Sequence, residues 1–277
     1  MWGIPIAIYL FIGGVVSGAF FTGILSEFFG GKKYKIIAKI ASYLVLISIM
    51  IGLLLLILDL GSPLRFWRLL LTLSETSVMS QGVWILVAFT TVGGVIYPAF
   101  HIAENSNLPI LSILKNKDGL RKFVGYIGFI FAVLTAVYTG VLLAATSCPL
   151  WSSTCFLPCL FFASAVSTGI SVIILFAKKN EFFLNKLIKA DCIAIIIELI
   201  IMVIFFISLA KIAPLSLKPM LVGQYSALFW IGVVIIGLIL PLILELQHKT
   251  SKIAALLVLV GGLILRYVIL LSGQSCL

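Results

Sequence analysis

Charged side chains and histidines are scarce in this sequence. Among its 277 residues, Asp, Glu, Lys and Arg together account for 10%, and only two histidines occur, His101 and His248. Soluble domains usually contain about 25% charged residues. Haem is held in proteins by axial ligands such as histidine, and a two-haem membrane electron carrier needs paired histidines at each haem. The sequence therefore excludes a soluble domain and a two-haem electron carrier.

Motifs of catalytic chemistry are also missing. The sequence contains no Walker sequence, no GxSxG, no HExxH and no CxxC cluster. These motifs supply a phosphate cradle, a nucleophile, zinc ligands and cluster thiolates. We therefore expect no ATP coupling, hydrolysis, metal binding or iron–sulfur ligation by this chain.

Long apolar runs are abundant instead. Hydrophobic residues make up 62% of the chain, and each run is long enough to cross about 30 Å of hydrocarbon as a helix. The first run has neither the basic flank nor the cleavage site of a signal peptide, so we interpret it as a retained helix. The sequence predicts an all-α integral membrane protein with eight transmembrane helices, at residues 3–28, 36–60, 80–104, 122–146, 157–178, 187–211, 223–246 and 252–273. We expect two four-helix bundles, formed by residues 1–147 and 148–277.

The basic residues predict the orientation of these helices, because Lys and Arg concentrate in cytoplasmic connections. The connections after the second, fourth and sixth helices contain only Arg65, Arg68, Lys211 and Lys218. We therefore expect a cytoplasmic (inner) membrane protein with both termini outside. The connections after the first, third, fifth and seventh helices, with their flanking turns, hold fourteen basic residues: Lys32, Lys33, Lys35, Lys39, Lys115, Lys117, Arg121, Lys122, Lys178, Lys179, Lys186, Lys189, Lys249 and Lys252.

Two cysteines bracket the connection between the fourth and fifth predicted helices. Cys148 and Cys155 occur in the segment CPLWSSTC, on the side where we expect the oxidising compartment. Disulfides persist in such compartments. The pair is a disulfide candidate, and two free apolar thiols are the alternative.

Several ionisable or phenolic side chains fall inside or at the ends of the apolar runs. Such residues are costly in hydrocarbon and are candidates for function. Asp59 could cap a turn or pair with Arg65 in LDLGSPLRFW. Glu198 and Arg266 lie at comparable depths, and we expect them to pair, as structural glue or as a step of a proton route.

Two further groups are candidates for proton or hydrogen-bond chemistry. His101 and Glu104 are one helical turn apart and could share a proton with water, or simply form an interfacial helix end. Tyr138 in AVYTGVLLAA needs a hydrogen-bond partner at membrane depth. A quinone carbonyl could be that partner.

The motifs together resemble one membrane-protein family over essentially the whole chain. The segments are WGIPIAIYLFIGGVVSGAF, LDLGSPLRFWRLL, SVMSQGVWIL, YTGVLLAATSCPLW, LFFASAVSTGISV and LRYVILLSGQ. In this combination they resemble the NrfD/PsrC family, the membrane subunits of polysulfide reductase and related respiratory complexes. The most specific part is LDLGSPLRFW with the following MSQGVW.

This resemblance implies a haem-free protein that binds menaquinone or ubiquinone near the outer face of its first bundle. It also implies an iron–sulfur subunit with [4Fe-4S] clusters, which usually serves a molybdopterin catalytic subunit. Tyr138 matches the family's tyrosine at the quinone, and Asp59 and Arg65 match the turn beside that pocket. Pro5 and Tyr9 stand where polysulfide reductase has an Asn and a His, so Tyr9 is the substitute donor.

Three functions are consistent with these residues. The first is an anchor subunit that exchanges electrons between the quinone pool and the iron–sulfur subunit, with Tyr138, Tyr9, Asp59 and Arg65 at the quinone. The second is a proton or ion translocator coupled to redox chemistry. The third is a passive membrane anchor. For the second, the route would use the intramembrane residues Glu198, Arg266, His101 and Glu104.

Overall fold

The computed structural model describes residues 3–59, 77–105, 114–115, 117–177, 183–247 and 251–275. Within these ranges the chain forms helices and turns and no strand. Eight helical segments in them are long and apolar enough to cross a membrane, which confirms the all-α class and the eight predicted spans. The first predicted span, 3–28, is helix α1 (Ile4–Gly30).

The remaining spans follow in chain order. The third and seventh each consist of an α-helical part joined to a wider π-type part, η3 or η5, which the sequence did not predict. Such wide turns are rare and occur often at functional sites. The spans are α2 (Lys35–Asp59), α4 (Val78–Phe89) with η3 (Thr90–Ile96) and α5 (Tyr97–Asn105), α7 (Asp118–Ala144), α9 (Phe156–Phe176), α10 (Leu184–Ile212), η5 (Leu228–Ile239) with α12 (Leu240–Leu246), and α13 (Ser251–Gln274).

Local sequence explains where several helices begin and end. Ser77 caps α4, because its Oγ accepts a hydrogen bond from the backbone N–H of Ser80 at 3.4 Å. Gly31 ends α1 with φ of 71°, a left-handed conformation that glycine adopts without a steric penalty. It starts the short helix η1 (Gly31–Tyr34), which turns the chain into α2. Two further short helices, α8 (Pro149–Ser152) and α11 (Lys218–Leu221), begin with proline in their first turn.

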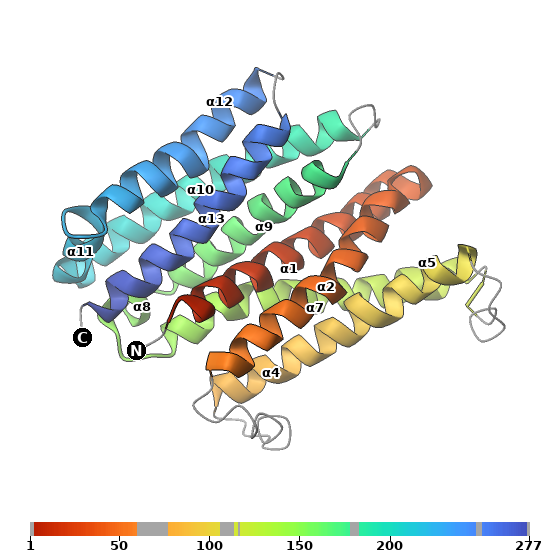
Figure 1. The fold of residues 1–277 in the computed structure, drawn as a ribbon, viewed down its shortest axis with the longest axis horizontal. Helices are drawn as coiled ribbons and strands as arrows, with labels where there is room; N and C mark the ends of the chain where they lie inside the picture. Colours follow the sequence, from red (N-terminus) through yellow and green to blue (C-terminus); the bar gives the residue numbers. More distant parts are fainter. Residues whose placement is uncertain are drawn as a thin grey trace.

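The eight spans lie side by side along the length of the molecule (Figure 1), and each packs on several of the others. In the first half α1 packs on α2 and α7, and the α4–η3–α5 span packs between α2 and α7. In the second half α9 packs on α10 and α13, and the η5–α12 span packs on α13. The two halves also share a long contact between α1 and α9. The division into bundles of residues 1–147 and 148–277 therefore stays a prediction.

Glycines bring the two halves together at the centre of the molecule. A Cβ added to Gly18 of α1 would overlap the backbone of Ala165 on α9, and one added to Gly169 would overlap the backbone of Gly18. Within the second half, Gly237 and Gly261 pack in the same way between η5 and α13. Small residues permit such backbone approach in membrane proteins, where packing drives helix association. The small residues of GGVVSGA, interpreted from sequence as packing positions, have this role at Gly18.

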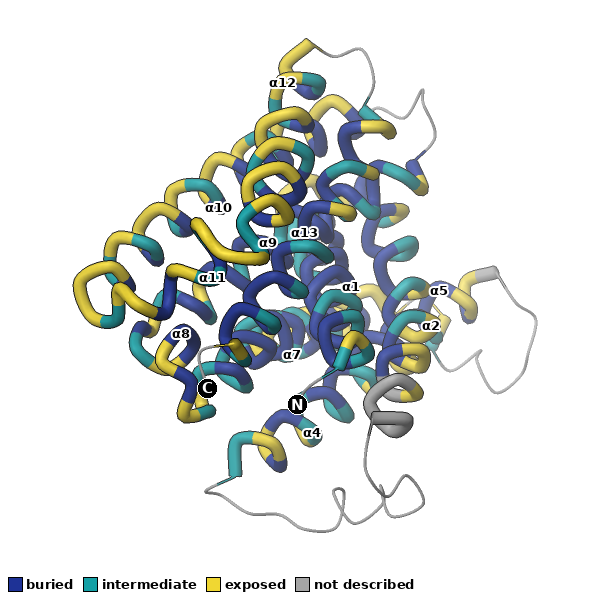
Figure 2. The backbone as a smooth tube through the Cα atoms, turned by 60° about the vertical axis from the view of Figure 1, so that its left-hand side comes forward, coloured by how far each residue is buried: buried dark blue, intermediate teal, exposed yellow. Residues whose placement is uncertain are grey.

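Exposed positions run along the outer helices (Figure 2), and many of them are large apolar residues. The outward face of α10, for example, carries exposed Ile193, Ile200 and Ile207. An exposed apolar face of this length fits lipid as the surrounding solvent. Figure 1 shows both chain termini at one end of the molecule, which we call the terminus end. The opposite end holds Lys35, Lys186 and Lys252, and we call it the basic end.

Candidate functional site

Two phenols form a pair near the terminus end of the first half. Tyr9 of α1 is 5% exposed and Tyr138 of α7 is 7% exposed, and both belong to one apolar cluster with Ile6 and Leu86. The two rings are close enough for their hydroxyls to interact electrostatically. Neither Tyr9 nor Tyr138 makes a side-chain hydrogen bond to another described residue. A buried tyrosine usually finds a hydrogen-bond partner, so these two phenols are candidates for contact with a polar ligand.

Glycines on the neighbouring helices make room for the phenols. A Cβ added to Gly82 of α4 would overlap the ring of Tyr138, and one added to Gly52 of α2 would lie 3.5 Å from Cδ2 of Tyr9. All four transmembrane helices of the first half therefore contribute residues to the surroundings of Tyr9 and Tyr138. Gly82 belongs to the MSQGVW motif, but the sequence alone did not predict its contact with Tyr138. A single glycine in the opening turns of an apolar helix is a signal for such close packing.

The structure brings together two of the four residues predicted at the quinone. Helix α2 ends at Asp59, whose side chain lies outside the described residues, as does all of Arg65. Pro5 is in the first turn of α1 and offers no side-chain hydrogen-bond donor. The site is therefore built, in the described part of the chain, on Tyr9 and Tyr138.

Glu198 and Arg266 meet in the second half, with serines of α9 between them. Arg266 Nη1 donates to Ser164 Oγ at 3.2 Å and to the Gly262 carbonyl at 3.0 Å. Glu198 Oε2 accepts from Ser167 Oγ at 2.5 Å, and Ser164 also interacts with this carboxylate. No ion pair within 4.0 Å joins Glu198 and Arg266 in the described structure. The predicted pair is thus a serine-bridged cluster.

The Arg266 side chain is enclosed, with 0% exposure. Its guanidinium carbon lies 5.3 Å from the ring centroid of Phe161 and 5.7 Å from that of Phe11. Gly14 of α1 provides the space, because a Cβ there would overlap Nη2. Nε and Nη2 have no hydrogen-bond partner among the described residues. Since an ionised group in hydrocarbon is costly, the cluster either fixes the packing of the two halves or moves charge.

A second acidic cluster in this half was missed by sequence reasoning. Asp191 of α10 and Glu245 of α12 are buried and interact with each other. Ser171 Oγ donates to Asp191 Oδ2 at 2.6 Å, and Cys192 Sγ donates to Glu245 Oε2 at 3.2 Å. Sequence position concealed the pair, because both acids lie near helix ends where an exposed carboxylate is ordinary. Only the packing of α9, α10 and α12 encloses them.

Another polar network lies near the basic end of the first half. Arg121 Nη2 contacts Glu27 Oε1 at 2.7 Å, and Tyr97 donates to the same carboxylate. His101 is buried with its ring centroid 5.2 Å from that of Tyr97, whereas Glu104 forms an ion pair with Lys35. The prediction that His101 and Glu104 share a proton is not tested by these contacts. Sequence reasoning missed Glu27, a lone acid in the last turns of an apolar run.

The disulfide candidates are separate thiols in this structure. Cys148 is buried, and its Sγ lies 3.2 Å from the Gly273 carbonyl. Cys155 is exposed. A disulfide between them stays a prediction for an oxidising compartment. In the described part of the chain, no group of three or more His, Cys, Asp and Glu side chains is arranged to hold a metal ion.

The fold and the buried polar groups define a multi-pass helical membrane protein, and comparison with known proteins gives its family. The model of the family described as polysulphide reductase, NrfD, matches residues 1–277. The chain belongs to this family, as its motifs indicated.

Three relatives illustrate the similarity. A polysulfide reductase chain from Wolinella succinogenes is 32% identical over 304 residues, covering 99% of this chain and 95% of the relative. The NrfD homolog of Haemophilus influenzae is 32% identical, with 99% and 94% covered. A selenate reductase subunit from Mesobacillus selenatarsenatis is 23% identical, with 98% and 74% covered. The first and third of these relatives are subunits of reductase complexes, which implies catalytic partner subunits.

Proposed function

We propose that this chain is the haem-free membrane subunit of a respiratory oxidoreductase complex that exchanges electrons between menaquinone or ubiquinone and an iron–sulfur subunit. The observation that carries the proposal is the pair of buried phenols, Tyr9 and Tyr138, which make no side-chain hydrogen bond to another described residue. Membership of the polysulphide reductase family supports it.

The chemistry of the site follows from these side chains. A quinol that is oxidised releases two electrons and two protons, so its binding site needs polar groups near both oxygens. Tyr9 and Tyr138 offer one hydroxyl each, from α1 and α7. The apolar cluster around them, which includes Ile6 and Leu86, excludes bulk water and strengthens each hydrogen bond.

The proposed partners lie at the terminus end, where the phenols are. We propose an iron–sulfur subunit with [4Fe-4S] clusters and a molybdopterin catalytic subunit there. Two relatives support partner subunits, because one is named as a chain of polysulfide reductase and the other as a subunit of selenate reductase. The basic end would then face the cytoplasm, in accord with the concentration of Lys and Arg there. The terminal substrate would be handled by the catalytic subunit.

Binding of a fluorescent quinol analogue tests the proposal. Titrations would compare the wild-type complex with Tyr138→Phe and Tyr9→Phe, following quenching of the analogue's fluorescence. Each variant removes one hydroxyl and keeps the ring, so we expect binding about tenfold weaker, the effect of one lost hydrogen bond. Tyr126→Phe is the matched control, because Tyr126 lies on the same helix, α7, and is exposed.

The outcomes separate the candidate functions. If the intact wild-type complex fails to bind the analogue, the quinone proposal is wrong and a passive anchor or translocator remains. If Tyr126→Phe weakens binding as much as Tyr138→Phe does, the phenol pair is not the site.

A second candidate function is redox-coupled proton movement through the second half. The favouring observation is that two buried acidic clusters lie on one face of α10. Asp191 and Glu198 are seven residues apart, which is roughly 10 Å along a helix. Ser171 and Ser167 of α9 contact these two carboxylates in the same order. We propose this row as a proton route that begins at the basic end and ends near Arg266.

A further inference from the structure

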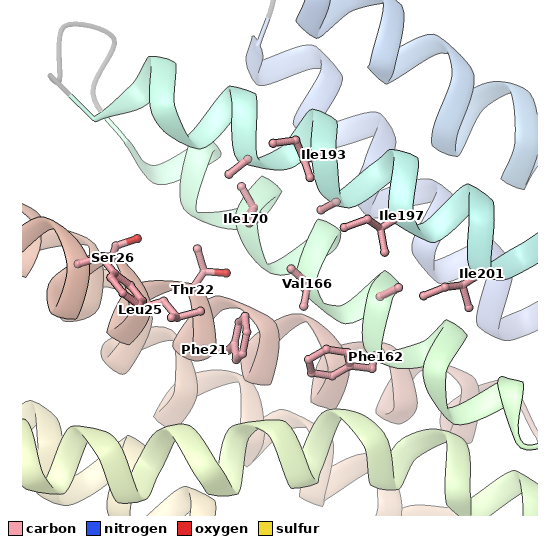
Figure 3. A pocket seen from close by; sticks show the side chains of 14 residues that line it. Phe21, Thr22, Leu25, Ser26, Phe162, Val166, Ile170, Ile193, Ile197 and Ile201 are labelled. Carbon is pink, nitrogen blue, oxygen red and sulfur yellow. The ribbon is translucent and has the colours of Figure 1, made fainter.

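An apolar groove runs along the outside of the molecule between its two halves (Figure 3). Its volume is about 590 Å³, and its lining comes from α1, α9 and α10. Both α1 and α10 pack on α9, so α9 is the floor and the other two helices are the walls. The groove opens toward the surroundings, because the lining side chains Phe29, Ile193 and Ile197 are exposed.

The groove continues into a second hollow at the basic end. This hollow has a volume of about 240 Å³ and shares Thr22, Ser26, Phe29 and Ala190 with the groove. Its far wall is formed by Tyr34 and Lys186, whose Nζ lies 5.4 Å from the centroid of the Tyr34 ring.

The turn after α1 builds this wall. Gly31, with its positive φ, redirects the chain into η1. Gly30 leaves space for the Tyr34 ring, which a Cβ at that position would overlap. The turn therefore holds Tyr34 against the hollow, beside Lys186.

Polar atoms gather only at this end of the groove. Thr22 is 8% exposed, and its Oγ1 has no hydrogen-bond partner among the described residues. Figure 3 shows the hydroxyls of Thr22 and Ser26 on the groove side of α1, one turn apart. Together with Lys186, these two hydroxyls form a cationic, hydrogen-bonding end of an otherwise apolar groove. A ligand that fits has an anionic head and an apolar tail.

The groove is long enough to follow one leaflet of a bilayer to its midplane. Ile201, the α10 lining residue farthest from Lys186, lies fifteen positions after it on the helix, which is roughly 22 Å along the axis. Half of the hydrocarbon thickness is about 15 Å. A lipid chain that starts at Lys186 can therefore stay in the groove as far as the bilayer midplane.

We infer that this groove binds an anionic phospholipid of the leaflet at the basic end, with its phosphate at Lys186, Thr22 and Ser26 and an acyl chain along α9. The cationic end favours an anionic lipid over a neutral one. A quinone fits less well, because the polar atoms gather at the membrane-interface end beside a cation, with hydrocarbon alone beyond them. Such a lipid would bridge the two halves beside the glycine contact of α1 and α9.

Native mass spectrometry of the delipidated complex, titrated with phosphatidylglycerol or phosphatidylcholine, tests the inference. We expect the wild type to retain phosphatidylglycerol more tightly at its highest-affinity site. Lys186→Gln should weaken phosphatidylglycerol binding roughly fivefold, the effect of one lysine at a membrane surface, and leave phosphatidylcholine binding unchanged. Lys189→Gln is the matched control, because Lys189 is an exposed lysine of the same helix outside the groove lining.

A second variant tests the apolar part of the groove. Ala190→Trp places a large ring where the groove and the hollow meet, and we expect it to abolish the high-affinity lipid site. Ile196→Trp is its control, since Ile196 is exposed on α10 and does not line the groove. Equal retention of both lipids by the wild type would overturn the inference, as would unchanged phosphatidylglycerol binding in Lys186→Gln. Recovery of a quinone or a second copy of the chain at this site would also overturn it.

Discussion

Glu198 shows how a single side chain can have either a structural or a functional role. It lies in the middle of α10, is 2% exposed, and accepts a 2.5 Å hydrogen bond from Ser167. Arg266 is in the same cluster and is joined to it through Ser164. If the cluster only fixes the packing, an uncharged residue of the same shape should affect folding alone. If it conducts protons, the same change should stop proton movement in a folded protein.

Glu198→Gln separates these roles at the residue scale. For the proton route, we expect proton movement in reconstituted vesicles to fall at least about tenfold, because a proton-transfer group is lost. Electron transfer from quinol should persist. Proton uptake can be followed with a pH-sensitive dye while electron transfer is followed with an artificial acceptor.

Asp118→Asn is the matched control for that experiment. Asp118 is a half-exposed carboxylate at the start of α7, far in sequence from the proposed route. The Asp118→Asn variant should leave the rates of proton movement and of electron transfer unchanged. A Glu198→Gln protein that pumps normally, or that merely folds in lower yield, would show that the cluster is structural.

Residues differ in how well the sequence predicts their place. Tyr138 was predicted through family resemblance, and the structure places Tyr9 beside it. Glu198 and Arg266 were predicted as partners because each interrupts an apolar run. Asp191 and Glu245 were not predicted as partners, because an acid near a helix end is usually solvated. Only tertiary packing buries these two side chains.

At the scale of elements, α1 is the helix on which both halves depend. It packs on α2, α7, α9 and α13, so it has no single buried stripe. Apart from Glu27 near its end, its residues are mostly apolar or small around the whole circumference, the pattern expected for an enclosed helix. Gly18 allows its backbone to touch that of α9.

Substitution of glycines in α1 tests this packing. Gly18→Leu would force the α1 and α9 backbones apart, and we expect a loss of about 3 kcal/mol in the free energy of unfolding. Gly13→Ala should be tolerated and could gain up to about 1 kcal/mol from helix propensity, because a Cβ there lies 3.7 Å from Thr139 Cγ2, an ordinary contact. Thermal unfolding in detergent measures both. Equal stability of the two variants would show that the halves do not depend on this crossing.

The existence of the elements was predictable, and their internal geometry was not. Hydrophobic length predicted all eight spans. The wide turns of η3 and η5 were not predicted, because a π-type segment has the same apolar composition as an α-helix. Its hydrogen-bond pattern depends on the neighbours against which it packs.

At the scale of the whole molecule, orientation in the membrane decides which partners can reach the phenol pair. The basic end carries most of the lysines and the terminus end few. Positive charge is retained on the cytoplasmic side. Tyr9 and Tyr138 would then lie near the outer face, within reach of an extracytoplasmic iron–sulfur subunit.

Fusions to reporter enzymes test this orientation. Alkaline phosphatase, which is active only outside the cytoplasm, should be active when it is fused to the carboxyl terminus. It should be inactive when it is fused after Lys117, in the basic connection before α7. Green fluorescent protein at the same two points should give the reverse pattern. An inactive phosphatase at the carboxyl terminus would invert the proposed topology and move the partner subunits to the other face.

The sequence by itself determined the class of this protein, the number of its spans and its family, because the length of an apolar run and a local motif depend only on consecutive residues. Tertiary structure alone decided which side chains from distant segments meet. It placed Gly82 against Tyr138 and enclosed Asp191 with Glu245. It also placed Thr22 and Lys186 in the lining of one hollow at the end of a groove. These contacts depend on how the helices cross, and helix crossing is set by the summed packing of all faces rather than by any single segment.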